Sequence, residues 1–261
     1  MQKVPMDETP EAENKEDFFE QMKRIEEERA SKGILIHEGW EYAPCEGGYC
    51  LDIFDWKLRG LDDEFLKYVN IPRELNGKPV VAISKDAFSY FGGFRLESLT
   101  IPDTVVDVNT RSIQVMSQKK KISLSVDPNN PKYSVIDGNL YSKNGKMLLC
   151  GIGKDGDGEI FVVPDGVSGI GDCALQRGKY AGVILPLSVR SIGKESLWDM
   201  KHTDSLKNIY FKGTKKEWNA ILKATAVPCV YYYKEGKPSF FDKKTWRFAA
   251  DGVTPEITKD K

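Results

Sequence analysis

An internal repeat constrains the fold of this chain more than any other feature of its sequence. The repeat is marked by four apolar-Pro dipeptides, which are Ile71-Pro72, Ile101-Pro102, Val163-Pro164 and Leu185-Pro186. The last three are followed by the spacing Pro-x-x-Val-x-x-(Ile/Val), and all four lead to the spacing apolar-x-x-x-(Ala/Ser)-apolar. A period of this kind is typical of stacked repeat architectures, so the repeats have to be assigned before any single helix or strand.

Each repeat contains a residue alternation that predicts a β-strand. Leu99 and Ile101, for example, alternate with hydroxyl residues, as expected of a strand with one buried face. Pro102 then ends the strand, because proline has no backbone hydrogen to donate to a continuing ladder. A unit of about 22 to 30 residues cannot bury its own apolar face, so we expect the units to stack into one continuous core.

The register of the repeat predicts which side chains form that core. We expect strands near residues 68–71, 96–101, 122–126, 160–163, 182–185 and 206–211. One buried stack should contain Ile83, Val108, Ile170 and Ile192. A second buried stack should contain Leu99, Leu124, Phe161 and Ile209.

A longer motif spans the junctions between the repeats. It reads Ile-Pro-x-x-Val-x-x-Ile, then Ala-Phe, and then Leu-x-x-Leu-x-Ile-Pro. This motif resembles the BspA-type leucine-rich repeats of bacterial proteins, over about residues 40 to 257. Leu175 and Leu197 depart from it, because they stand where the family has Phe. The resemblance implies an α/β fold, a right-handed leucine-rich-repeat solenoid of mostly short parallel strands with short helical or 3-10 turns. It also implies a cell-surface or secreted protein.

Ahead of the repeats, the chain has a tail and a helix. Residues 1–13 are polar and acidic and predict a disordered tail. Residues 14–33 show helical spacing, with acids early and Gly33 as the stop, and predict an amphipathic helix. This helix either packs on the first repeat or projects freely, and we favour packing because the open end of stacked repeats needs a cover. Residues 34–261 then form the repeat region.

Two later segments are similar to further parts of the same family. Residues 133–151 resemble its hairpin insertion, with a turn at Asp137-Gly138 or Asn144-Gly145. Residues 214–257 resemble its C-terminal cap. Within the cap we expect a helix from Thr214 to Ala224 that turns Trp218, Ile221 and Leu222 inward.

The charge balance argues against nucleic acid as a partner. The chain has 38 basic and 39 acidic residues and a net charge of −1, whereas phosphate binding requires a clustered positive surface. The short basic run from Lys119 to Lys121 is typical of a solvated turn. No stretch reaches the roughly 18 consecutive apolar residues of a membrane helix, and the first residues lack the features of a signal peptide. A cytoplasmic location therefore stays open beside the cell surface.

The sequence offers no recognisable catalytic or metal site. Its two histidines, His37 and His202, lie outside known nucleophile and metal motifs. Cys45 and Cys50 lack a second Cys/His pair at zinc spacing, and whether they form a local disulfide stays open. The acidic loop from Asp155 to Glu159 offers oxygens to calcium, but without the EF-hand pattern it is typical of a solvated turn. We therefore expect a protein that is not an enzyme and that uses neither cofactor nor metal.

The outward columns of the expected strands are the candidate binding surface. One column contains Asn70, Thr100, Ser125, Val162, Ile184 and Tyr210, and the other contains Tyr68, Ser98, Ser123, Ile160, Gly182 and Asn208. The candidate site residues are Ile160, Val162, Ile184, Asn208, Tyr210 and Thr100. If the apolar ridge of Ile184 and Tyr210 serves a partner, it should be exposed. The alternative is that the hairpin or the C-terminal tail covers it.

These observations favour a non-catalytic binding module. The resemblance implies protein–protein interaction or adhesion at a bacterial cell surface, with a protein of the host or of the bacterium as partner. One alternative is a carbohydrate- or glycoprotein-binding accessory, in which exposed rings such as Tyr90, Phe91 and Tyr231 stack on sugars. The other is a purely structural stalk.

Overall fold

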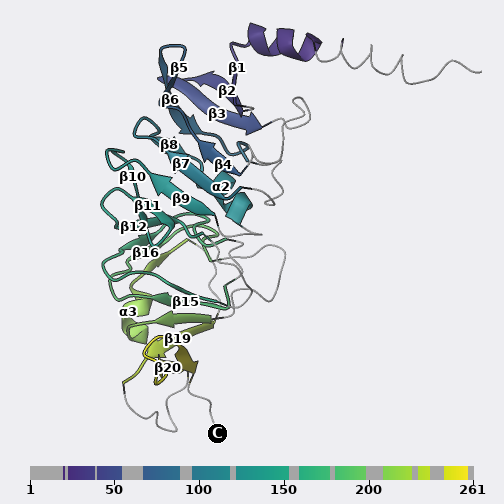
Figure 1. Ribbon diagram of the computed structural model, residues 1–261. Helices are drawn as coiled ribbons and strands as arrows, with labels where there is room; N and C mark the ends of the chain where they lie inside the picture. Colours follow the sequence, from purple (N-terminus) through teal and green to yellow (C-terminus); the bar gives the residue numbers. More distant parts are fainter. Residues whose placement is uncertain are drawn as a thin grey trace, which may run out of the picture.

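The protein is an elongated, strand-rich α/β molecule in which successive strands follow one another along the long axis (Figure 1). The computed structural model describes residues 20, 23–38, 40–54, 67–88, 96–117, 122–152, 159–176, 180–197, 208–224, 229–235 and 244–257. The expected tail at residues 1–13, the Lys119–Lys121 run and His202 lie outside these residues, as does most of the Asp155–Glu159 loop.

Two parallel ladders build the C-terminal half. The first joins the strands β13 (Ile160–Val162), β15 (Gly182–Leu185), β17 (Asn208–Phe211) and β19 (Cys229–Tyr233). The second joins β12 (Met147–Cys150), β14 (Gly169–Ile170), β16 (Ser191–Ile192) and β18 (Leu222–Lys223). Strands of the two ladders alternate along the chain, so each repeat adds one strand to each ladder.

The N-terminal half is built in the same way from different sheets. A three-stranded parallel sheet contains β4 (Tyr68–Asn70), β7 (Ser98–Ile101) and β9 (Ser123–Val126). A six-stranded sheet contains β1 (Leu35–His37), β2 (Trp40–Cys45), β3 (Gly48–Phe54), β5 (Glu74–Leu75), β6 (Lys78–Ile83) and β8 (Asp107–Val108). The helix α2 (Thr110–Ser117) follows β8.

An antiparallel hairpin separates the two halves. It consists of β10 (Tyr133–Ile136) and β11 (Asn139–Ser142), and Asp137 and Gly138 form its turn with φ angles of 51° and 78°. A second turn with Asn144 and Gly145 leads into β12. The Tyr133 hydroxyl accepts a hydrogen bond from the Val108 backbone N–H at 3.0 Å and so ties the hairpin to the N-terminal half.

The described part of the N-terminal helix projects from the molecule and covers little of its surface. Residues 23–31 are helical, and Gly33, with φ of 68°, ends the helix. The backbone N–H of Ile34 donates to the Arg29 carbonyl and that of Gly33 to the Ala30 carbonyl, which is the usual glycine-terminated helix end. Most of the described helix is exposed, and the ion pair of Arg29 with Glu41 anchors only its last turns. The prediction that the helix packs on the first repeat is therefore wrong for this part of the helix.

The C-terminal helix is shorter than the sequence predicts. Helix α3 covers Lys215–Asn219 and begins with a capping box between Thr214 and Glu217. The chain then leaves the helix because Leu222 and Lys223 form β18 and pair with β16. Trp218 and Ile221 are buried as expected, but Leu222 is exposed. The last two strands are β20 (Thr245–Phe248) and β21 (Pro255–Ile257).

All eight residues of the two predicted core stacks are buried. The hairpin nevertheless divides the predicted single core into two large clusters. Ile83 and Val108 pack in the N-terminal cluster, and Ile170 and Ile192 pack in the C-terminal one. The register follows the same division, because Ile83 pairs with Val108, whereas Ile170 pairs with Leu148 and Ile192.

Replacing Ile170 by Ala should lower the free energy of unfolding by about 2 to 5 kcal/mol, because it leaves a cavity between two paired repeats. Val162→Ala is the control, since that side chain is exposed, and it should change stability by less than about 1 kcal/mol. Urea denaturation of both variants measures the difference. Equal effects would show that the Ile170 site is not part of the core.

Candidate functional site

The apolar ridge predicted from the sequence is internal. Ile184 has an exposed fraction of 1 % and Tyr210 of 5 %, so of the two alternatives that the sequence left open, an exposed and a covered ridge, the structure shows the covered one. The two residues are neighbours as predicted, because β15 and β17 pair with Ile184 opposite Tyr210. The predicted register of these two strands is therefore confirmed.

The C-terminal segment covers this ridge. Trp246 of β20 lies on the outward side of β17, where its ring meets Tyr210 edge-on at a centroid distance of 5.4 Å. Its indole N–H donates to the Phe211 carbonyl at 3.0 Å, which fixes the ring in place. Tyr231 stacks on the other side of Tyr210 at 5.9 Å. A small cluster of Ile184, Tyr210 and Trp246 results, and it corresponds to the covered alternative.

Gly182 leaves room for the Tyr210 ring to pack against the sheet. A Cβ atom at Gly182 would stand 2.7 Å from Cε2 of Tyr210, so any larger residue there would push the ring outward. The Asn208 amide donates to the Tyr210 hydroxyl at 3.3 Å and holds the other end of the side chain. Burial raises the pKa of the Tyr210 hydroxyl. A glycine inside an outward column was the sequence signal that a large neighbour folds over it.

The remaining candidates of the C-terminal half form no continuous surface. Ile160 and Asn208 are half-buried, and both lie next to Gly182 in their column. Val162 is 47 % exposed and belongs to β13, which pairs only with β15 in the described residues. One exposed valine does not make an interaction site.

The outward side of the three-stranded sheet remains open. We call it the polar face and define it by the outward residues Tyr68, Asn70, Ser98, Thr100, Ser123 and Ser125. Tyr68 is 55 % exposed, and Thr100, the one site candidate of this half, is half-buried. The inward partners Val69, Leu99 and Leu124 are buried. The polar face therefore lies over a packed core.

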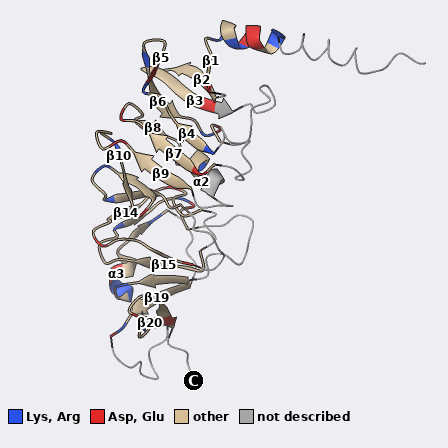
Figure 2. Cartoon of the chain, in the orientation of Figure 1, with Lys and Arg blue, Asp and Glu red and all other residues tan. Residues whose placement is uncertain are grey.

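Hydrogen bonds within the polar face order its side chains. The Ser125 hydroxyl donates to the Thr100 hydroxyl at 3.1 Å, between neighbouring strands. The Tyr68 hydroxyl donates to the Glu97 carboxylate at 3.3 Å, at the start of the next strand. No charged residue lies within β7 or β9 (Figure 2). The outward residues of these strands are themselves uncharged and rich in hydroxyls, and the Glu97 carboxylate lies at their margin.

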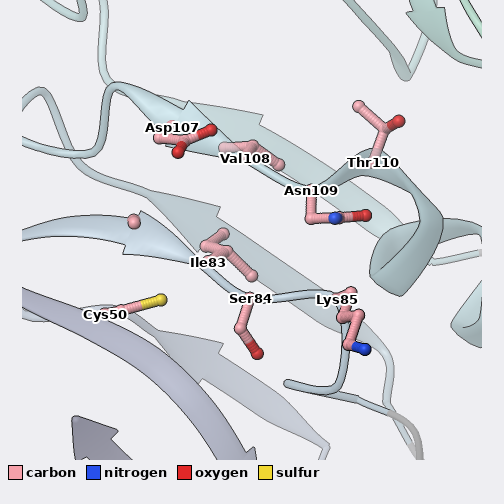
Figure 3. A pocket seen from close by; sticks show the side chains of 9 residues that line it. Cys50, Ile83, Ser84, Lys85, Asp107, Val108, Asn109 and Thr110 are labelled. Carbon is pink, nitrogen blue, oxygen red and sulfur yellow. The ribbon is translucent and has the colours of Figure 1, made fainter. Parts of the chain in front are cut away.

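The cysteines do not form a reactive pair. Cys45 lies opposite Gly48 and Cys50 opposite Ala43, so the two thiols are not directly across the hairpin, and both are free. Cys50 faces a hollow of about 370 Å³ at the ends of β3, β6 and β8 (Figure 3). Burial is the main cause that raises the pKa of the Cys50 thiol to about 12, and burial also raises that of Cys45. Neither thiol is ionised at neutral pH, which makes both weak nucleophiles.

The described residues include one histidine, His37. His37 contacts the ring of Tyr42 edge-on at 6.4 Å, and burial is the main cause that raises the pKa of the Tyr42 hydroxyl. No cluster of three or more His, Cys, Asp or Glu side chains there is arranged to hold a metal ion. None of the helices in the described part of the chain is long and apolar enough to cross a bilayer.

Ile184→Glu should destabilise the protein by at least about 3 kcal/mol, because it places a carboxylate beneath Trp246. Val162→Glu is the matched control in the neighbouring strand and should cost less than about 1 kcal/mol. Thermal and urea unfolding of the two variants test this difference. A stable Ile184→Glu variant would mean that the C-terminal segment does not cover the ridge.

Thiol labelling at pH 7.5 should follow burial rather than reactivity. Cys45 is exposed and should react first. Cys50 should react at about a tenth of that rate or below, and the buried Cys150 only after unfolding. Mass spectrometry of peptides from a time course of alkylation gives the order, and Cys45→Ser identifies the fast phase. Rapid modification of Cys50 would contradict its raised pKa.

Comparison with known proteins gives limited similarity. No protein family model matches the chain, and no curated protein matches its sequence. Among solved structures, a leucine-rich repeat protein from Eubacterium ventriosum is 17 % identical, with a TM-score of 0.44 over 60 % of this chain and 40 % of that one. The pneumococcal vaccine antigen PcpA is 15 % identical, with a TM-score of 0.35 over 59 % of this chain and 54 % of its own. A leucine-rich cell surface protein from Faecalibacterium prausnitzii is 20 % identical, with a TM-score of 0.34 over 57 % of this chain and 55 % of its own. The chain spans between 40 % and 55 % of the length of these three proteins.

Proposed function

We propose that this protein is a non-catalytic binding module that contacts a protein partner through the polar face. The observation that carries the proposal is the difference between the two outward surfaces. Trp246 covers Ile184 and Tyr210 on one sheet, whereas the outward residues of β4, β7 and β9 stay open. An exposed surface backed by a buried core is the arrangement on which repeat proteins present their binding residues.

The composition of the polar face suits a protein ligand. Surfaces built from Tyr, Ser, Asn and Thr bind proteins well, because a tyrosine supplies contact area at a low entropic cost and short polar side chains adapt their hydrogen bonds. Tyr68 supplies the ring, and the hydrogen bond between Ser125 and Thr100 orders two hydroxyls before any partner arrives. Ordering before binding lowers the entropic cost of association.

The absence of enzymatic activity is part of the same proposal. It is supported by the raised pKa values of Cys45 and Cys50, whose thiols stay protonated at neutral pH. The charge balance of 38 basic to 39 acidic residues supports a protein rather than a nucleic acid as partner.

We further propose that the repeats form a right-handed leucine-rich-repeat solenoid that acts in interaction or adhesion at a bacterial cell surface. The support is the resemblance of the repeat motif to BspA-type repeats, together with the alternation of strands between two parallel ladders. A carbohydrate-binding accessory is less favoured on the polar face, because Tyr68 is its one ring, while Tyr231 stacks on Tyr210. Tyr90 and Phe91 lie outside the described residues.

Capture experiments with matched variants test the polar face. The full chain is immobilised and exposed to bacterial and host cell extracts, as wild type and as the double variant Asn70→Arg/Ser125→Arg. The control is Leu222→Arg/Val253→Arg, which adds the same charge at exposed positions elsewhere. Proteins that bind the wild type and the control but not the face variant, with melting temperatures unchanged, are the expected result. An identical set captured by all three would exclude the polar face as the interface.

A further inference from the structure

A recess with mixed chemistry lies at the C-terminal end of the molecule. It has a volume of about 520 Å³ and lies where β13, β15, β17, β19 and β20 end. Because neighbouring strands from β13 to β20 run parallel, their carboxyl ends meet at one edge of the sheet. A volume of this size lies within the range of small-molecule sites, which is about 300 to 1,000 Å³.

An aromatic ring forms one wall of this recess and is held in place from behind. Tyr233 is 36 % exposed. Trp246 meets it edge-on at 5.3 Å and Phe248 lies 6.1 Å away, and both rings also contact each other. Since the Trp246 indole is anchored on the Phe211 carbonyl, the Tyr233 ring is supported by a fixed neighbour. Leu187, which is also exposed, adds an apolar surface from the turn after β15.

A charged pair also lines the recess. The Lys212 ammonium lies 3.1 Å from the Asp165 carboxylate, and the Asp165 side chain is largely exposed. The Lys212 side chain is 27 % exposed, so the pair is open to solvent mainly on the side of Asp165. A ligand that reaches the pair from that side can share its donor and its acceptor. The recess thus offers an ammonium donor and a carboxylate acceptor side by side, together with an aromatic ring.

The turn that carries Asp165 is fixed by its neighbour. The backbone N–H of Gly166, with φ of 91°, donates to the Ser188 hydroxyl at 3.1 Å, and this hydroxyl donates to the Val167 carbonyl at 2.7 Å. Ser188 therefore connects two consecutive repeats, and the carboxylate is presented from a braced turn.

The chemistry of the recess distinguishes between two kinds of occupant. An aliphatic or aromatic side chain of a partner would cover Lys212 and Asp165 without replacing the hydrogen bonds that water gives them, which is unfavourable. A pyranose has a face of C–H groups that can lie on the Tyr233 ring, and its neighbouring hydroxyls can accept from the ammonium and donate to the carboxylate at the same time. Of these two occupants, only the pyranose contacts the aromatic ring and also forms hydrogen bonds with the ammonium and the carboxylate.

We propose that this recess binds a pyranose sugar, with Tyr233 as the stacking surface and with Lys212 and Asp165 as its hydrogen-bonding groups. Leu187 and Phe248 enclose the apolar side of the sugar ring. The site does not depend on the proposed function of the polar face, because the two surfaces share no residue and belong to different sheets.

Sugar binding to the full chain tests the site directly. Glucose, galactose, mannose and N-acetylglucosamine are offered as free sugars and as short oligosaccharides, and saturation-transfer NMR and calorimetry record binding. We expect at least one sugar to bind, Tyr233→Ala to weaken it by about tenfold or more, and Tyr233→Phe to retain it. Lys212→Met should weaken binding to a similar extent, since it removes the donor and keeps most of the length of the side chain. Free sugar and oligosaccharide arms distinguish a single-ring site from one that reads a glycan chain.

Tyr68→Ala is the matched control, because it removes an exposed tyrosine from the polar face and should leave sugar affinity unchanged. Melting temperatures show whether Tyr233→Ala disturbs the packing of Trp246. If it does, Lys212→Met still tests the site, because this substitution leaves the aromatic cluster intact. No binding by any sugar at millimolar concentration would overturn the proposal. Binding that survives both Tyr233→Ala and Lys212→Met would do the same.

Discussion

The rest of the structure depends on parallel backbone pairing in one register from repeat to repeat. Phe161 lies opposite Val183, Val183 opposite Ile209 and Ile209 opposite Val230, so every inward position continues into the next repeat. A single repeat has too little apolar surface to bury itself, and only this register makes the partial cores continuous. The same register fixes the outward positions, because the side-chain period of a strand is two residues.

A register that sorts side chains into columns does not decide whether an outward column is exposed. On the N-terminal sheet the outward residues are polar and at least partly exposed to solvent. On the C-terminal sheet the outward column contains Ile184 and Tyr210, and here the segment with Trp246 lies over the face. The aromatic cover also stabilises the end of the ladder, where β19 would otherwise have one open edge.

The sequence therefore predicts the environment of the inward-facing side chains better than that of the outward-facing ones. The repeat predicted the strands of the three-stranded sheet and of the first ladder and all eight core residues, because each rests on spacing within or between neighbouring repeats. The family resemblance predicted the hairpin but left its turn open between Asp137-Gly138 and Asn144-Gly145, and the structure has Asp137-Gly138 between β10 and β11. The sequence left open whether Tyr210 is exposed or covered, because its burial depends on Trp246, a residue outside the repeat motif. It also overestimated α3, because local helix signals continue to Ala224 while Leu222 and Lys223 join a ladder. Where ladder pairing competes with helix propensity, pairing with an existing neighbour prevails.

The division of the core explains why two unlike surfaces coexist on one chain. The polar face is supported by Val69, Leu99 and Leu124, which belong to the N-terminal cluster. The recess is supported by Trp246 and Phe248, which belong to the aromatic cluster at the other end. Between them the hairpin interrupts both ladders, and the described strands of the two halves do not pair with each other. Substitutions at sites that share no packing partner usually have additive effects. A polar surface and an aromatic recess can therefore be tuned separately, each by the side chains of its own repeats.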